Sequence, residues 1–210
     1  AGSAVGVEVL LNPEGDQRVD AISGVAITSE SIYITVLKDV NGFLWRARRG
    51  EQEWVLAPIN LPENGAIQVS SVDDYTDSVL VNYQSFLIPN TLYLVQGDSE
   101  PTAIKTLKPR FDASIYVTEQ KFSTSADGTR IPYFIVRPVD VPMDSTTPTE
   151  LTAYGGFELS RTPAYLGGME QIWLGRGGAY VLANIRGGGE YGPRWHQSAI
   201  LENRQRVLDR

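Results

Sequence analysis

The chain has 210 residues, of which 42% are hydrophobic and 20% are charged, a composition typical of a soluble globular protein with one large or two small domains. Its formal net charge of −7 predicts repulsion from nucleic acid and from anionic membranes. There is no cysteine and only one histidine, His196, which excludes disulfides, cysteine nucleophiles and thiolate or histidine-rich metal sites. We therefore expect no nucleic-acid partner, no membrane partner, no metal and no other cofactor.

The N-terminus carries no recognisable targeting signal. Residues 1–5 lack the basic region and apolar stretch of a signal peptide, and no run of about 18 apolar residues occurs anywhere in the chain. The first residue is alanine rather than methionine, which indicates a processed or truncated start from which an export signal could be missing. The expected location is cytoplasmic.

Residues 1–109 are expected to form short β-strands, because β-branched and aromatic residues recur between turn signals without a helical period. The two groups of four strands, within 19–57 and 66–107, predict two successive blades of a β-propeller. Asn41-Gly42 predicts a hairpin turn, since both positions of a type I′ turn need positive φ. The predicted strands are 19–28, 31–38, 43–48, 53–56, 66–72, 78–85, 91–96 and 103–106.

Two groups of charged residues in this half are interpreted as solvated surface. Three arginines on one predicted strand are typical of an exposed face, and the acidic group lacks the glycine and the terminal glutamate of a calcium loop. The basic group is Arg46, Arg48 and Arg49, and the acidic group is Asp73, Asp74 and Asp77.

Residues 110–210 have a different pattern, typical of an α/β fold, so the expected fold class is mixed β and α/β. Strands are predicted at 116–123 and 131–138, joined by a tight hairpin at 126–129, and at 151–154. A short helix is predicted at 169–176, and the apolar run 179–185 predicts a buried strand of a parallel sheet. A final helix is predicted at 193–208, with Trp195, Ala199, Ile200 and Val207 as its candidate buried positions.

The chain contains no complete catalytic triad. A nucleophile elbow of the form G-x-S-x-G is absent, and so is the alternative serine–lysine pairing Ser-x-x-Lys. His196 and Ser198 are two residues apart on a predicted helix, where their side chains point to different sides. His196 is therefore interpreted as a residue of the helix surface or helix end.

Two glycine-rich segments are candidates for tight backbone geometry. The segment 175–178 precedes a predicted strand, whereas a dinucleotide-binding loop follows one, so nucleotide binding is not favoured. In the segment 186–189 the glycines predict a rigid bend, with Arg186 able to pair with Glu190 near a helix start. Tyr154, before Gly155-Gly156 at a strand end, has two interpretations: an oxyanion donor, or a packed aromatic residue in a turn.

Four segments resemble the start of the catalytic domain of the prolyl oligopeptidase family. They are 125–134, 154–157, 181–196 and 202–209, of which the stretch 183–195 is the most specific. Members of that family have an α/β-hydrolase domain capped by a seven-bladed β-propeller. The resemblance implies that residues 1–109 are the last blades of the propeller and that residues 110–210 begin the hydrolase domain.

The resemblance also implies a function: a serine peptidase that hydrolyses short peptides, often after proline, through an acyl-enzyme. Its Ser–Asp–His triad would lie beyond the chain end, so this chain alone is expected to be inactive. Tyr154 matches the family tyrosine that stabilises the oxyanion, and Asn184, Arg186 and Glu190 match a loop with an expected scaffolding role. Ala153 stands where many members have glycine, which indicates a branch other than the best-known prolyl oligopeptidases.

A second hypothesis remains open from the residues alone. The missing triad and the missing edge strands would also suit a naturally short, non-catalytic β-rich binding module. If the chain is instead a fragment, its open sheet edges predict marginal stability or self-association.

Overall fold

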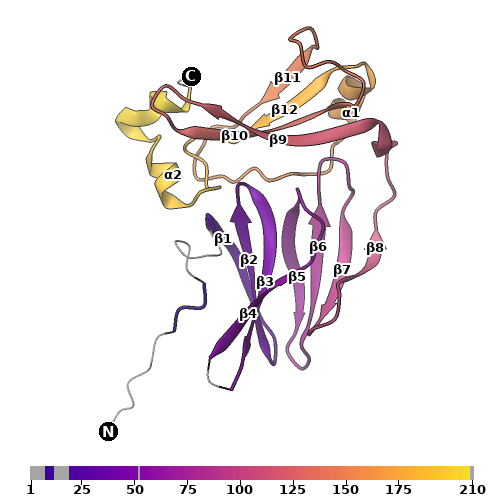
Figure 1. Ribbon diagram of the computed structural model, residues 1–210, viewed down its shortest axis with the longest axis vertical. Coiled ribbons are helices and arrows are strands. Elements are labelled where there is room, and N and C mark those ends of the chain that lie inside the picture. The colour runs from indigo at the N-terminus through magenta and orange to yellow at the C-terminus, as the bar shows by residue number, and fades with distance from the viewer. Residues whose placement is uncertain (1–7, 12–18, 52, 209–210) are drawn as a thin grey trace.

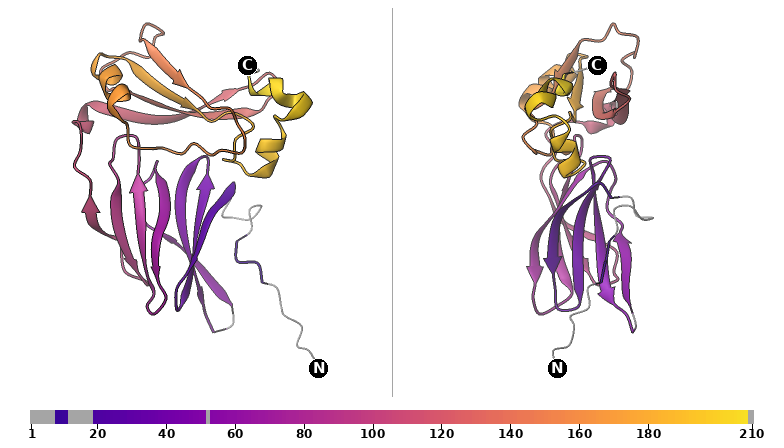
Figure 2. Two further views of the ribbon diagram at one scale, coloured as in Figure 1. Left: turned by 180° about the vertical axis from the view of Figure 1, so that it is seen from behind. Right: turned by 90° about the vertical axis from the view of Figure 1, so that its left-hand side faces the viewer.

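The computed structural model describes residues 8–11, 19–51 and 53–208. Two antiparallel sheets stand side by side beneath a mixed sheet that carries short helices (Figure 1). The segment 153–167 runs between the tips of the two lower sheets and the mixed sheet, as both Figure 1 and the reverse view in Figure 2 show. This arrangement agrees with the expected mixed β and α/β fold class.

Each lower sheet is a four-stranded antiparallel meander in which the strands follow one another in chain order. Pairing is in register except for one bulge between β1 and β2, one between β5 and β6, and one between β7 and β8. All eight predicted strands are present. The first sheet contains β1 (Ala21–Ile27), β2 (Ser31–Lys38), β3 (Asn41–Arg49) and β4 (Trp54–Ile59), and the second contains β5 (Ala66–Asp73), β6 (Ser78–Gln84), β7 (Thr91–Gln96) and β8 (Thr102–Thr106).

The two meanders pack face to face through alternating apolar side chains. On β6 every second residue is buried, which is the period expected for a strand with one covered face. The resulting core joins both sheets and consists of Tyr33, Leu44, Val79, Val81 and Val95.

The prediction for the β2–β3 turn was wrong by two residues. The turn residues are Asp39 and Val40, with φ values of 46° and 68°, and Lys38 pairs with Asn41 across the hairpin. Gly42 lies within β3, where its N–H donates to the carbonyl of Gly65 at 2.9 Å. A Cβ at position 42 would lie 2.8 Å from the backbone nitrogen of Ile67, so the glycine permits the second meander to approach closely.

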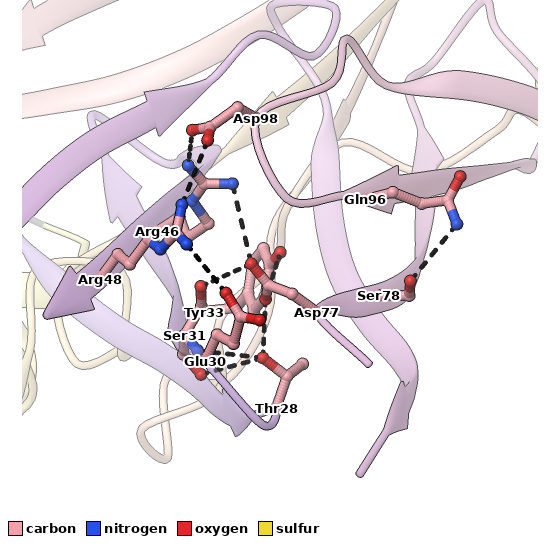
Figure 3. Close-up of polar contacts among 10 residues, drawn as sticks. All are labelled: Thr28, Glu30, Ser31, Tyr33, Arg46, Arg48, Asp77, Ser78, Gln96 and Asp98. Atoms are coloured by element: carbon pink, nitrogen blue, oxygen red, sulfur yellow. Dashed lines mark hydrogen bonds and ion pairs between the residues drawn. The ribbon is translucent and has the colours of Figure 1, made fainter. Parts of the chain in front are cut away.

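Arg46 and Asp77 are not solvated, contrary to the prediction. Their side chains are 7% and 11% exposed, and they form an ion pair between the two meanders with a nitrogen–oxygen distance of 3.9 Å. Arg46 also pairs with Asp98 in the β7–β8 turn (Figure 3). Arg48 and Arg49 do remain at the surface, as predicted.

Asp77 also collects hydroxyl donors from the first meander. Its carboxylate accepts hydrogen bonds from Thr28 at 2.7 Å, Ser31 at 2.8 Å and Tyr33 at 3.2 Å (Figure 3). Burial, followed by the charge of Asp77, raises the pKa of Tyr33. One carboxylate thus connects the β1–β2 turn, β2 and β3 of the first meander to the β5–β6 turn of the second.

The upper sheet has the strand order β11-β12-β10-β9, with β11 and β12 parallel and the other neighbours antiparallel. The predicted helix at 169–176 is present as α1, and the predicted apolar strand is β12, whose first four residues are buried. The elements of this half are η1 (Ala113–Ile115), β9 (Tyr116–Thr124), β10 (Arg130–Pro138), β11 (Thr149–Thr152), α1 (Gly168–Gly175), β12 (Ala179–Ala183), α2 (Pro193–Gln197) and η2 (Leu201–Val207).

The predicted helix at 193–208 is not continuous. Ile200 has extended backbone and Leu201 has a φ of 50°, so α2 ends at Gln197 and a separate 3-10 helix, η2, follows. Of its candidate buried positions, only Ala199 is fully buried. Packing around Ala199, whose side chain lies against Gly187, takes precedence over helical propensity here.

The two halves share one apolar core. Val40 from the β2–β3 turn and Phe86 from the β6–β7 loop are fully buried against Phe134 and Tyr180 of the mixed sheet. The centre of the Phe86 ring lies 5.4 Å from that of Phe134. The backbone carbonyl of Phe86 accepts a hydrogen bond from the N–H of Leu166. The meander tips are therefore part of the core of the upper half.

We expect Asp77→Ala to lower the free energy of unfolding by about 3 kcal/mol, because it removes the carboxylate that pairs with the buried Arg46 guanidinium and accepts hydrogen bonds from three hydroxyls. Asp74→Ala, at an exposed position of the same turn, is the matched control and should change it by less than about 0.5 kcal/mol. Urea unfolding followed by tryptophan fluorescence measures both. Equal effects of the two substitutions would contradict a structural role for Asp77.

We also expect the chain to self-associate through β1, an edge strand of its sheet with three exposed apolar side chains, Ile22, Val25 and Ile27. Lysines at positions 25 and 27 should shift the population toward monomer, because charges on an edge strand oppose strand pairing. Tyr75→Lys, which removes an exposed aromatic residue from a turn, is the control and should leave the distribution unchanged. Sedimentation velocity over a concentration series measures this; an unsubstituted chain that stays monomeric throughout would rule it out.

Candidate functional site

The candidate site lies where two parallel strands end. Tyr154 follows β11 and Asn184 follows β12, and these strands run in parallel, so both residues emerge at the same sheet edge. The carboxyl ends of parallel strands are where open α/β sheets bind ligands. Glu190 joins them from the glycine-rich loop after β12.

Glu190 is the centre of this cluster. Its side chain is 0% exposed, and one oxygen, Oε1, accepts three hydrogen bonds. The donors are the hydroxyl of Tyr154, the backbone N–H of Arg161 at 2.8 Å and the amide of Asn184 at 3.2 Å. The other oxygen, Oε2, has no partner within the described part of the chain. A fully buried carboxylate with only neutral donors is costly to maintain, which marks the cluster as a candidate for function.

The loop after Tyr154 has strained backbone. Gly156, Phe157 and Glu158 are three consecutive residues with positive φ, at 81°, 54° and 57°. The glycine-rich loop holds this strained segment in place, since the carbonyl of Gly187 accepts the N–H of Glu158 at 2.9 Å. Strain of this kind persists only where the surroundings determine it, and it is common near active sites.

Gly188 brings the glycine-rich loop directly onto the pair formed by Tyr154 and Glu190. A Cβ at position 188 would overlap Oε2 of Glu190 and would lie 2.6 Å from the Tyr154 hydroxyl. Any side chain there would displace the pair, so glycine at this position lets the predicted bend pack directly against the two side chains.

The hydroxyl of Tyr154 is strongly engaged. Burial, then the hydrogen bond to Glu190 and its charge, raise the pKa of Tyr154, which keeps the phenol protonated. A phenol has a single O–H, and here it donates its hydrogen bond to Glu190. The phenol is therefore a neutral, partly buried donor, and an anion can accept its hydrogen bond if that anion outcompetes the carboxylate of Glu190.

Arg186 is not part of this cluster, and the predicted pairing with Glu190 was wrong. Its guanidinium is buried and donates to Asp127 and, at 2.8 Å, to the hydroxyl of Ser125, both in the β9–β10 hairpin loop. The hydrogen bonds that Thr129 donates, followed by that of Arg186, lower the pKa of Asp127 to about 2. Arg186 therefore fixes the hairpin loop to the end of β12.

His196 and Ser198 do not meet. Nδ1 of His196 lies 2.8 Å from the carbonyl of Gly187, and the hydroxyl of Ser198 donates to the carbonyl of Trp195 at 2.8 Å. Among the residues that the structure describes, no group of three or more histidine, aspartate or glutamate side chains could hold a metal ion. What the site contains is one hydroxyl donor with its supporting residues.

A cavity of about 430 Å³ lies near this site. It is lined by uncharged side chains of β1 and β2 in the first meander and of β5 and β6 in the second, together with Ser160 and Thr162 from the loop after Tyr154. These two residues flank Arg161, whose N–H binds Glu190. The space beside the candidate site therefore suits a neutral ligand.

Comparison with known proteins identifies the family. Residues 8–108 match the N-terminal β-propeller domain of prolyl oligopeptidase, and residues 166–209 match the prolyl oligopeptidase family model. The chain belongs to the prolyl oligopeptidase family. Its two four-stranded meanders are accordingly propeller blades, and its mixed sheet belongs to the start of the hydrolase domain.

Relatives and solved structures of this family cover most of the chain. It is 40% identical over 202 residues to an uncharacterized peptidase of Sinorhizobium fredii, covering 96% of this chain and 27% of the relative. It is 34% identical over 152 residues to a prolyl endopeptidase of Elizabethkingia miricola, and the match covers 72% of this chain and 21% of the relative. A post-proline cleaving enzyme from Rickettsia typhi superimposes with a TM-score of 0.79 at 32% identity, covering 90% of this chain and 27% of that one.

The chain thus spans about a quarter of the length of the relatives that it matches. In the described residues, no helix has the length and apolar character needed to cross a membrane.

We expect acid to weaken the hairpin contact between Asp127 and Arg186. Because the pKa of Asp127 is depressed in the folded chain, its contribution is present above the unfolded value near 3.8 and is lost as the pH falls toward about 2. Asp127→Asn should therefore flatten the pH dependence of the unfolding midpoint between about pH 4 and pH 2, whereas Asp74→Asn should not. Denaturant unfolding at several pH values measures this; parallel curves for Asp127→Asn and the unsubstituted chain would contradict it.

Proposed function

We propose that the polypeptide carrying these residues is a serine peptidase that hydrolyses short peptides through an acyl-enzyme, with Tyr154 as an oxyanion donor. The single observation that carries this is the position of Tyr154: a partly buried, neutral hydroxyl donor just beyond the carboxyl end of a parallel strand, in a chain of a serine peptidase family. Relatives named prolyl endopeptidase and a structure named a post-proline cleaving enzyme support peptide bonds as the substrate class.

The proposed division of labour follows from the two halves. Residues 1–109 would supply propeller blades, and residues 110–210 would supply the first strands of the hydrolase domain with the oxyanion donor. The nucleophile, its histidine and its aspartate would come from a part of the polypeptide outside these 210 residues, which contain no G-x-S-x-G. The uncharged lining of the cavity next to Ser160 and Thr162 suits a neutral peptide segment.

In this function Asn184 supports the site, whereas Arg186 holds the β9–β10 hairpin loop in place. Asn184 donates to Glu190 and, at 2.7 Å, to the carbonyl of Arg161, so it connects the end of β12 to the loop after Tyr154.

A fluorophosphonate probe tests the proposed function, because only a serine hydrolase with an activated nucleophile takes the label. The full-length gene product should be labelled, and a short peptide substrate should compete with the probe. The 210-residue chain, which lacks an elbow serine, should stay unlabelled and serves as the matched control. A full-length product that takes no label would instead support a non-catalytic binding module.

A further inference from the structure

We propose that Glu190 is the positioning residue for Tyr154: it fixes the phenol at the strand end and competes for the single proton that the oxyanion needs. This inference rests on the proposed function, in which Tyr154 stabilises the oxyanion. It adds a residue that sets how readily that donor is available.

Glu190 is anchored independently of Tyr154. Its Oε1 accepts the N–H of Arg161 and the amide of Asn184, which come from the segment after Tyr154 and from the end of β12. Gly188 closes over the other oxygen, so the carboxylate has no room to move. The phenol, by contrast, is only partly buried and is held at its hydroxyl by Glu190. The carboxylate is therefore the fixed partner, and the tyrosine is the group that it orients.

The anchor also controls where the proton goes. A carboxylate is a stronger acceptor than a neutral oxygen, so the developing oxyanion has to outcompete Glu190 for the hydroxyl of Tyr154. Among the described residues no salt bridge includes Glu190, so no cation is paired with its carboxylate. Glu190 thus holds the hydroxyl of Tyr154 in place and keeps its hydrogen bond until an anion forms that accepts it more strongly.

Glutamine at position 190 separates placement from charge. Two donors, from Arg161 and Asn184, face Oε1, so the amide oxygen of a glutamine would occupy that position. The amide NH₂ would then take the place of Oε2, which has no partner in the described residues. Glu190→Gln keeps an acceptor for the phenol while removing the negative charge, whereas Glu190→Ala removes both.

The test is a double-mutant cycle in the full-length peptidase, with kcat and KM measured separately on a short peptide. Tyr154→Phe should lower kcat by about 10²-fold to 10³-fold with little change in KM. Glu190→Ala should lower kcat by about 10²-fold, and adding it to Tyr154→Phe should cause little further loss, because the phenol it positions is already gone. Glu190→Gln should retain kcat within about tenfold of the unsubstituted enzyme.

Controls separate positioning from folding. Glu202→Ala, at an exposed position at the start of η2, should leave kcat unchanged, and thermal melts of all variants report any loss of structure. If Tyr154→Phe lowers kcat but the loss from Glu190→Ala adds to it in full, positioning is wrong and the oxyanion role of Tyr154 stands. If Glu190→Gln loses as much activity as Glu190→Ala with an unchanged melt, positioning through an acceptor is equally wrong. If Tyr154→Phe has no effect, the oxyanion role of Tyr154 and the positioning role of Glu190 both fail, while the peptidase activity itself stands.

Discussion

The structure depends on the turn between β2 and β3, where a blade enters the core of the hydrolase half. Val40 is β-branched and has a φ of 68°, a conformation that costs about 1 to 3 kcal/mol for such a residue. Its side chain is fully buried against the mixed sheet, and burying a valine contributes about 1.5 to 3 kcal/mol. The two magnitudes are comparable, so the turn keeps this shape because of its tertiary contacts. The blade and the hydrolase half therefore stabilise each other's local structure.

The same turn also positions the candidate site. Asp39 accepts a hydrogen bond at 2.9 Å from the hydroxyl of Tyr191, the residue directly after Glu190. Burial, then this contact, raise the pKa of Tyr191, so the hydroxyl stays a donor. On the other side Glu190 accepts the hydroxyl of Tyr154. The glycine-rich loop is thus held between a propeller turn and the end of a hydrolase strand, and a shift of one half relative to the other would act directly on the loop that carries Glu190.

Local sequence patterns were sufficient for most elements and insufficient where distant segments meet. The eight blade strands and the buried run of β12 follow from alternation and apolar composition, which are local properties. Asn41-Gly42 was misread because Gly42 serves the approach of β5, and Arg46 because its acceptors lie on another meander. The predicted helix through Ile200 failed for a similar reason: its spacing was helical, but packing at Ala199 interrupts it. None of these partners is visible from spacing within one segment.

In the candidate site, too, local patterns were sufficient for the strand ends but not for the contacts between distant segments. The sequence correctly placed Tyr154 at the end of a strand, but the nearness of Arg186 and Glu190 in sequence suggested a pair that the structure does not contain. A buried carboxylate facing an arginine would have its charge neutralised, and it would accept less strongly from a phenol. With Arg186 directed to Asp127, the donors to Glu190 in the described residues are all neutral, and only that of Tyr154 is a hydroxyl whose proton can turn to another acceptor. Because Arg186 does not pair with Glu190, the hydroxyl of Tyr154 is the donor in this cluster that can leave Glu190 and turn to a new anion.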